Sequence, residues 1–134
     1  MLIRTDVDQE RAKSILRMVE QTLLMVSEID FKQFSSNVSK EYYEIIRELM
    51  SVVLLLDGFK TIGDGAHKEI IEYVSKNYSQ FSSQEMELID ELRITRNKIA
   101  YEGFFVNSDY LNRNISLIKE IIEKFKILVQ EKMN

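Results

Sequence analysis

The sequence predicts an all-α protein, an antiparallel up-down bundle of four to five helices. Three observations predict this class: the 134 residues contain no proline, they contain only four glycines, and apolar residues recur every three or four positions through most of the chain. Proline and glycine most often interrupt helices, so their scarcity leaves few places for breaks. The length suits one domain with a single core, which we place over residues 1–134.

The first helix is expected from about Asp6 to Glu28, with Asp6 as its N-cap. An aperiodic segment, 30–37, follows, and Ser39 is expected to cap the second helix. The later half of that helix is apolar nearly all round, which predicts that it is the central helix of the bundle. Gly58 should end it in the left-handed conformation that glycine adopts readily.

Three more helices are expected after this glycine. Asp64 can open the third helix. Ser82 and Glu85 have the spacing of a capping box, in which each side chain accepts a hydrogen bond from the other residue's backbone N–H. They predict the start of a fourth helix, which ends at Gly103, and the fifth should begin near residue 107 or 108.

The composition narrows the class of protein. Without cysteine, and without paired histidines at helical spacing, the chain offers no disulfide, no thiolate and no metal site, and we expect no cofactor. The longest apolar run, Val52 to Leu56, is far shorter than the roughly 20 residues that span a bilayer. The N-terminus also lacks the apolar run of a signal peptide. We therefore expect an intracellular, cytoplasmic protein without membrane contact.

Arg96 is the residue that a purely structural helix would rarely contain at its position. With about 100° of rotation per residue, Arg96 lies on the same narrow arc as the apolar Leu92 and Ala100. An arginine there must find a partner or stay in contact with water at a cleft. A structural interpretation pairs it with a carboxylate such as Asp90 or Glu41, whereas a functional interpretation leaves its guanidinium for a ligand.

The order Arg96, Asn97, spacer and Tyr101 resembles the motif of the HEPN family (higher eukaryote and prokaryote nucleotide-binding). The family motif runs arginine, usually a polar residue, a spacer and histidine, so Tyr101 stands here where histidine would be. Three longer segments resemble the family's helices in the same order and spacing: 42–60, 67–73 and 93–106. The resemblance implies a helical bundle, a homodimer formed across the motif helix, and association with RNA or nucleotides.

Many HEPN proteins are metal-independent ribonucleases, and the resemblance makes Arg96, Asn97 and Tyr101 the candidate catalytic residues. Arg96 fits the role of stabilising charge on a phosphate, and Asn97 can orient it. Tyr101 is a poor replacement for histidine as a base, because a phenol is almost wholly protonated at neutral pH. Residues five apart on a helix also diverge by roughly 140°, so Arg96 and Tyr101 of one chain are not expected to face one site.

Other residues near the motif are candidates for binding. The formal net charge of −4 gives no general attraction to nucleic acid, so binding depends on a local basic cluster, for which Arg93 and Lys98 are candidates beside the motif arginine. Phe104 and Phe105 cannot both turn inward, and we expect them at a dimer interface. His67, the only histidine, is expected to pack on the apolar face of its helix without a catalytic role.

Three functions fit this sequence. The first in rank is a non-catalytic or weakly active module that binds RNA or nucleotides, for example as the partner of a small nucleotidyltransferase, because histidine is missing from the motif. The second is a metal-independent ribonuclease or toxin component that uses Arg96 and Asn97. The third is a purely structural interaction bundle. Whether the protein is an enzyme stays open at this stage.

Overall fold

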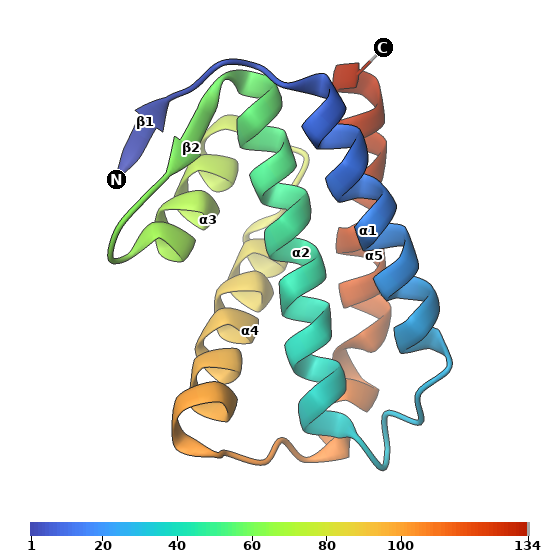
Figure 1. Ribbon diagram of the computed structural model, residues 1–134. Helices are drawn as coiled ribbons and strands as arrows, with labels where there is room; N and C mark the ends of the chain where they lie inside the picture. The colour runs from blue at the N-terminus through green and yellow to red at the C-terminus, as the bar shows by residue number, and fades with distance from the viewer. Residues whose placement is uncertain (134) are drawn as a thin grey trace.

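The computed structural model describes residues 1–133, which form five helices and one two-stranded sheet (Figure 1). This confirms the predicted all-α helical bundle. None of the five helices in this range is long and apolar enough to cross a bilayer. The elements in chain order are β1 (Leu2–Arg4), α1 (Gln9–Ser27), α2 (Ser35–Asp57), β2 (Phe59–Thr61), α3 (Ala66–Asn77), α4 (Ser83–Glu102) and α5 (Ser108–Met133).

The four long helices alternate in direction along the chain, and α2 lies at the centre (Figure 1). It packs against α1, α4 and α5 and also contacts α3, so most of its side chains are buried. Burying a Val, Leu, Ile or Met side chain stabilises a fold by about 1.5–3 kcal/mol. One stripe of α2 is only partly buried and carries polar side chains; this polar stripe consists of Glu44, Arg47, Glu48 and Ser51.

The predicted helix ends are confirmed where the signal is local. Gly58 ends α2 with φ 86° and Gly103 ends α4 with φ 64°, both in the left-handed region. Ser82 and Glu85 form the capping box: the Glu85 backbone N–H donates to Ser82 Oγ at 3.1 Å, and the Ser82 N–H donates to Glu85 Oε1 at 2.8 Å. Lys124 of α5 pairs with the same oxygen at 2.8 Å, which ties the start of α4 to α5.

Three predicted helix starts are wrong. α1 is capped by Asp8, whose side chain accepts from the Arg11 N–H, and not by Asp6. Ser39 does not cap α2; it is buried one turn inside a helix that begins at Ser35. α3 begins after Gly65, not at Asp64. In each case the sequence offered a polar side chain that could cap the helix nearby. Packing against other elements decided at which residue the helix begins.

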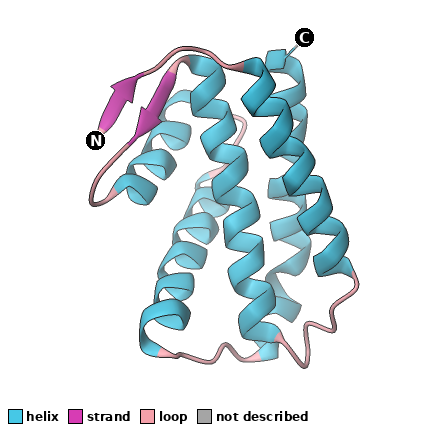
Figure 2. Cartoon of the chain, in the orientation of Figure 1, coloured by secondary structure: helices cyan, strands magenta, loops and turns pink. Residues whose placement is uncertain are grey.

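The small two-stranded sheet was not predicted, and it occupies little of the chain (Figure 2). β1 pairs antiparallel with β2, with Leu2 opposite Thr61, and the Thr5 N–H donates to the Gly58 carbonyl at 2.9 Å. Strands of three residues are too short to show the alternation that marks a strand in a sequence. The pairing holds residues 2–5 beside the end of α2, which explains why α1 starts later than predicted.

A partly buried carboxylate ties three elements together near the end of α2. Asp57 accepts hydrogen bonds from the hydroxyls of Tyr73 and Tyr78 and from the Lys132 ammonium of α5. Burial alone would raise the pKa of Asp57, but the hydrogen bonds from Lys132, Tyr78 and Tyr73 outweigh it and hold the pKa below its ordinary value. The ionised carboxylate therefore stabilises the folded state.

We predict that Asp57→Asn lowers the free energy of unfolding by roughly 2–3 kcal/mol at neutral pH, because the amide cannot replace the charge opposite Lys132. A group whose folded pKa is depressed contributes stability that is lost as pH falls through the ordinary value of 3.8 to the lower folded value. The difference between the two proteins should therefore shrink in acid. Urea unfolding at about pH 7 and about pH 3 measures both effects. Glu131→Gln, an exposed carboxylate of α5, is the control, and an equal loss there would contradict the prediction.

Candidate functional site

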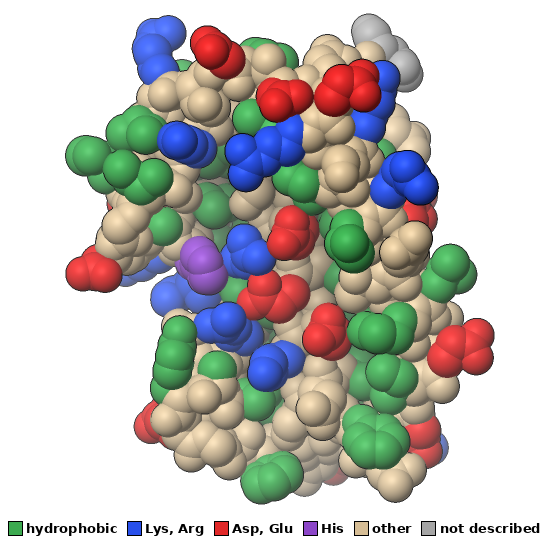
Figure 3. All heavy atoms as spheres, in the orientation of Figure 1, with side chains coloured by type: hydrophobic (Ala, Val, Ile, Leu, Met, Phe, Trp, Pro, Cys, Tyr) green, Lys and Arg blue, Asp and Glu red, His purple; other side chains and the backbone are tan. Residues whose placement is uncertain are grey.

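The candidate site lies where α2, α3 and α4 meet. Three guanidinium groups gather there, and we call Arg47 of α2 with Arg93 and Arg96 of α4 the arginine cluster. Their charges act on both the Tyr43 hydroxyl and the His67 ring, so the five side chains share one environment. Figure 3 shows basic and acidic side chains around the single histidine on this face of the molecule.

Glu44 joins the two helices that carry the arginines. Its Oε1 lies 3.1 Å from Arg96 Nε, and its Oε2 accepts from Arg47 Nε at 3.0 Å and lies 2.9 Å from Arg47 Nη2. Arg96 Nε and Glu44 Oε1 are both shielded from solvent and face each other at ion-pair distance without hydrogen-bond alignment. The carboxylate therefore fixes Arg96 of α4 against α2.

The same ion pairs leave other guanidinium nitrogens unused. Arg93 is bound through Nε, which donates to Asp90 Oδ1 at 2.8 Å, and neither of its terminal nitrogens has a hydrogen-bond partner within residues 1–133. In the same range, Arg96 Nη2 has none either. An arginine can offer five N–H donors in a planar fork that matches phosphate oxygens. The two arginines of α4 are thus oriented by carboxylates and retain donors for a ligand.

The structure brings the three candidate catalytic residues together. Arg96 Nη1 donates to Asn97 Oδ1 at 3.3 Å, and Arg96 Cζ lies 5.9 Å from the centre of the Tyr101 ring. The expectation that Arg96 and Tyr101 do not face one site is therefore wrong, although α4 continues unbroken to Glu102. The long arginine side chain spans the angle between the two positions. Tyr101 is 77% exposed, so its ring lies at the rim of the site.

The structural interpretation of Arg96 named the wrong carboxylates. Asp90 pairs with Arg93, three residues further along the same helix, which is a favourable spacing for a helical ion pair. Glu41 forms no ion pair with Arg96; Glu44, one turn later on α2, does. The sequence indicated that Arg96 points toward the bundle, but it did not show which turn of α2 lies opposite.

The remaining candidates lie away from the cluster. Lys98 is about 200° around α4 from Arg96, and its Nζ lies 5.7 Å from the centre of the Phe104 ring. It is therefore directed toward the end of the helix and not toward the arginine cluster. Phe104 and Phe105 are both exposed, Phe105 to 86%. Both aromatic rings therefore lie at the surface of the protein.

His67 was not predicted as a site residue, and the structure places it in the site. Instead of lying within an apolar face, its ring is partly exposed and lies 6.1 Å from the Tyr43 ring, centre to centre. Burial lowers the pKa of His67, and the positive charge of Arg47 lowers it further, so the imidazole is neutral at neutral pH. A neutral imidazole can accept a proton.

Tyr43 supplies a different kind of group. Its side chain is fully buried, and within the described residues its hydroxyl has no hydrogen-bond partner. Burial raises the pKa of Tyr43 to about 12, despite the opposing charge of Arg47. The phenol therefore stays protonated beside His67. An unpaired buried hydroxyl costs free energy, and such groups concentrate where a protein binds or reacts.

These side chains together provide directed donors for an anion, one neutral imidazole and one protonated phenol. Within residues 1–133 no group of three or more His, Asp or Glu side chains is placed to hold a metal ion. Beside the guanidinium nitrogens that have no partner in this range lies one proton acceptor, the neutral imidazole of His67.

Comparisons of this chain with protein-family models, with curated proteins and with solved structures found no match.

Proposed function

We propose that the arginine cluster binds the phosphates of RNA or of a nucleotide, and that the protein acts as a HEPN-like binding module. One observation carries this proposal: Arg93 and Arg96 are held in place by carboxylates through Nε while terminal nitrogens stay unpaired at a partly open surface. Unpaired donors on an oriented guanidinium are available to hydrogen-bond phosphate oxygens. The role of partner to a small nucleotidyltransferase rests on the family resemblance alone.

The cluster is not a strongly basic surface. Glu44 lies within ion-pair distance of two of its arginines, Glu48 and Asp90 each lie within that distance of one, and His67 is neutral. Affinity must therefore come from short, directed hydrogen bonds more than from a long-range field. With two phosphates contacted, the logarithm of the affinity for a single strand should fall with the logarithm of salt concentration with a slope of only about −1.4.

We predict that Arg93→Ala and Arg96→Ala each weaken binding of a short single-stranded RNA roughly 10-fold, because each removes a charge-assisted hydrogen bond to phosphate. Fluorescence anisotropy with labelled RNA measures the effect. Arg17→Ala, which removes an exposed charge from α1, should change binding little and serves as the control. Arg96→Ala should cost only about 1 kcal/mol of stability, since Glu44 keeps its pair with Arg47.

The opposite results would show that Arg96 stabilises the fold and does not bind a ligand. A large loss of stability in Arg96→Ala, together with unchanged RNA and nucleotide affinity in both α4 variants, would leave a purely structural bundle as the better account. An equal loss of RNA affinity in Arg17→Ala would show that binding responds to total charge and not to the cluster.

Metal-independent cleavage of RNA is a second candidate function, favoured by the position of His67. In such a reaction the ribose 2′ oxygen bonds to phosphorus, its proton passes to the imidazole, and the bond from phosphorus to the 5′ oxygen breaks. Arg96 would stabilise the charge on the phosphate oxygens. The products are a 2′,3′-cyclic phosphate and a 5′ hydroxyl, whose proton is returned by the imidazolium.

For this second function we predict that cleavage in the presence of a chelator falls about 10²- to 10⁴-fold in His67→Gln, because that range is typical for loss of a general acid or base. Tyr101→Phe should cleave like the unmodified protein, since in this reaction the imidazole of His67 both accepts and returns the proton, and Tyr101 lies exposed at the rim. Gel separation of end-labelled RNA follows the reaction. Loss of activity in Tyr101→Phe alone would make the tyrosine catalytic, and no cleavage by the unmodified protein would leave only the binding function.

We also propose that two copies of the chain associate through the end of α4. Every buried residue of α4 lies before Arg93, so its last ten residues receive little cover from the rest of the bundle. Large apolar side chains gather there on the surface: Ile94, Tyr101, Phe104 and Phe105. An isologous contact between two such ends covers both patches and places two arginine clusters near one another.

We predict that Phe105→Ser shifts the protein toward the monomer, because it removes the most exposed aromatic ring of the proposed interface. Sedimentation velocity over a range of concentrations measures the shift. Leu24→Ser on α1 is the matched control, since Leu24 is 70% exposed and lies on another helix. A monomeric unmodified protein at every concentration, or an equal effect of Leu24→Ser, would contradict the interface.

A further inference from the structure

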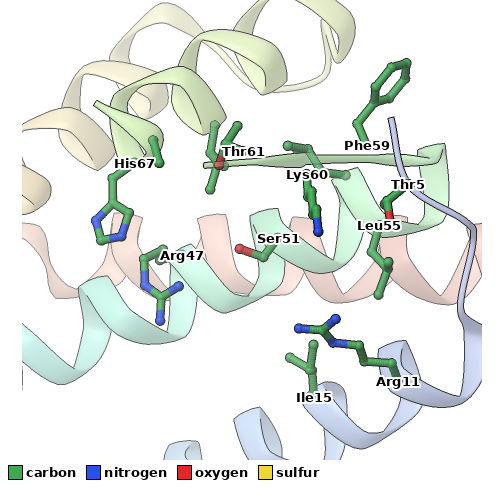
Figure 4. A pocket seen from close by; sticks show the side chains of 13 residues that line it. Thr5, Arg11, Ile15, Arg47, Ser51, Leu55, Phe59, Lys60, Thr61 and His67 are labelled. Atoms are coloured by element: carbon green, nitrogen blue, oxygen red, sulfur yellow. The ribbon is translucent and has the colours of Figure 1, made fainter. Parts of the chain in front are cut away.

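A second basic site adjoins the arginine cluster. It is a pocket of about 270 Å³ between α1, α2, α3 and the small sheet, and Figure 4 shows its side chains. Arg11 reaches it from α1, Arg47 from α2, Lys60 from β2 and His67 from the first turn of α3. α2, β2 and α3 follow one another closely in the sequence, and folding adds α1 to complete the pocket.

The charged side chains that line the pocket are all basic. The lining contains three cationic side chains and a histidine but no aspartate or glutamate, in a chain with 22 acidic residues and 18 lysines and arginines. Thr5, Ser51 and Thr61 add hydroxyls, which can donate to an anion. The rest of the wall is apolar, which lowers the local dielectric and strengthens each charged contact. Arg47 is paired with Glu44 and Glu48 from outside this lining, whereas Arg11 and Lys60 face the pocket without a carboxylate among its residues, which suits a negatively charged ligand.

Several of these donors are unused within residues 1–133. Neither Arg11 nor Lys60 forms a side-chain ion pair or hydrogen bond there, and Arg47 uses only Nε and Nη2 for its carboxylates. The N-cap of α3 is Gly65, which has no side chain to cap the helix, and the first two residues of α3 lie in the wall. The positive end of a helix favours an anion, although this helix already carries the Glu69 carboxylate in its first turn.

We propose that this pocket binds one phosphate group, either as the free ion or as the monoester end of a small molecule. Arg11, Lys60 and the unused end of Arg47 contact the phosphate oxygens, and the hydroxyls of Ser51 and Thr61 complete the shell. The volume lies just below the roughly 300–1,000 Å³ of most small-molecule sites, which limits the ligand to a compact molecule. The apolar wall accommodates its organic part.

This site goes beyond the function proposed for the arginine cluster, because its defining residues are different. Arg11 and Lys60 lie on α1 and β2, whereas Arg93 and Arg96 lie on α4 and line no part of the pocket. The two sites share Arg47 and His67, so substitutions at those positions cannot separate them. Arg11→Gln and Lys60→Gln can.

Isothermal titration with inorganic phosphate and with ribose 5-phosphate tests the proposal on the full chain. We expect saturable binding of both, weakened roughly 10-fold by Arg11→Gln and again by Lys60→Gln. Arg17→Gln, the same change two turns along α1 and outside the pocket, should leave affinity within about twofold. Because Arg11 lies outside the arginine cluster, Arg11→Gln should leave RNA affinity unchanged, which keeps this result independent of RNA binding by that cluster.

The two ligands distinguish the sources of the phosphate. Tighter binding of ribose 5-phosphate identifies a monoester site, and equal binding identifies a site for the ion itself; both support the pocket. Absence of saturable binding by the unmodified protein would overturn the proposal. So would an equal loss in Arg17→Gln, because it would show a general response to charge.

Discussion

Glu44 is the residue on which the position of the site depends. It lies on the one polar stripe of an otherwise buried helix, and it holds Arg47 of its own helix and Arg96 of α4 through separate oxygens. A carboxylate buried in this way is tolerated because both of its oxygens face guanidinium groups. Without it, two arginines would face each other across the junction of α2 and α4. The ion pair thus explains how a bundle with a well-packed core can carry several positive charges at the partly exposed junction of α2 and α4.

The part of the fold that could be predicted is the part decided within a few residues. The capping box at Ser82 and the glycines that end α2 and α4 act through local backbone geometry, and the sequence shows them directly. Ser39 failed as a cap because the chain before it already packs as helix, which only the tertiary fold decides. The sheet could not be predicted for a similar reason. Its strands are defined by their pairing with each other and not by a pattern of residues within each strand.

The site also has one part that could be predicted from the sequence and one part that could not. Arg96 and Asn97 could be identified because a cation on an apolar arc is visible in one helix, whereas His67 lies on another helix and reaches them only through packing. The sequence of α2 did contain one indication of a polar neighbour such as His67. The polar stripe from Glu44 to Ser51 interrupts a helix that is otherwise apolar, and such a stripe must face polar or charged neighbours from elsewhere in the chain. Sequence periodicity shows that such neighbours are needed, but it does not show which helix supplies them.

The weak cover of the end of α4 has a consequence for motion. Backbone hydrogen bonds there are shielded by few buried side chains, so this segment should open locally at a much lower free energy than α2, which is enclosed on most sides. Amide hydrogens after Arg93 should exchange early, while those of α2 exchange only with global unfolding. A ligand or second chain that contacts the end of α4 must then hold this part of the helix in its folded conformation. Part of the binding free energy is used for that ordering. Recognition and local folding would therefore be one thermodynamic event at this end of the molecule.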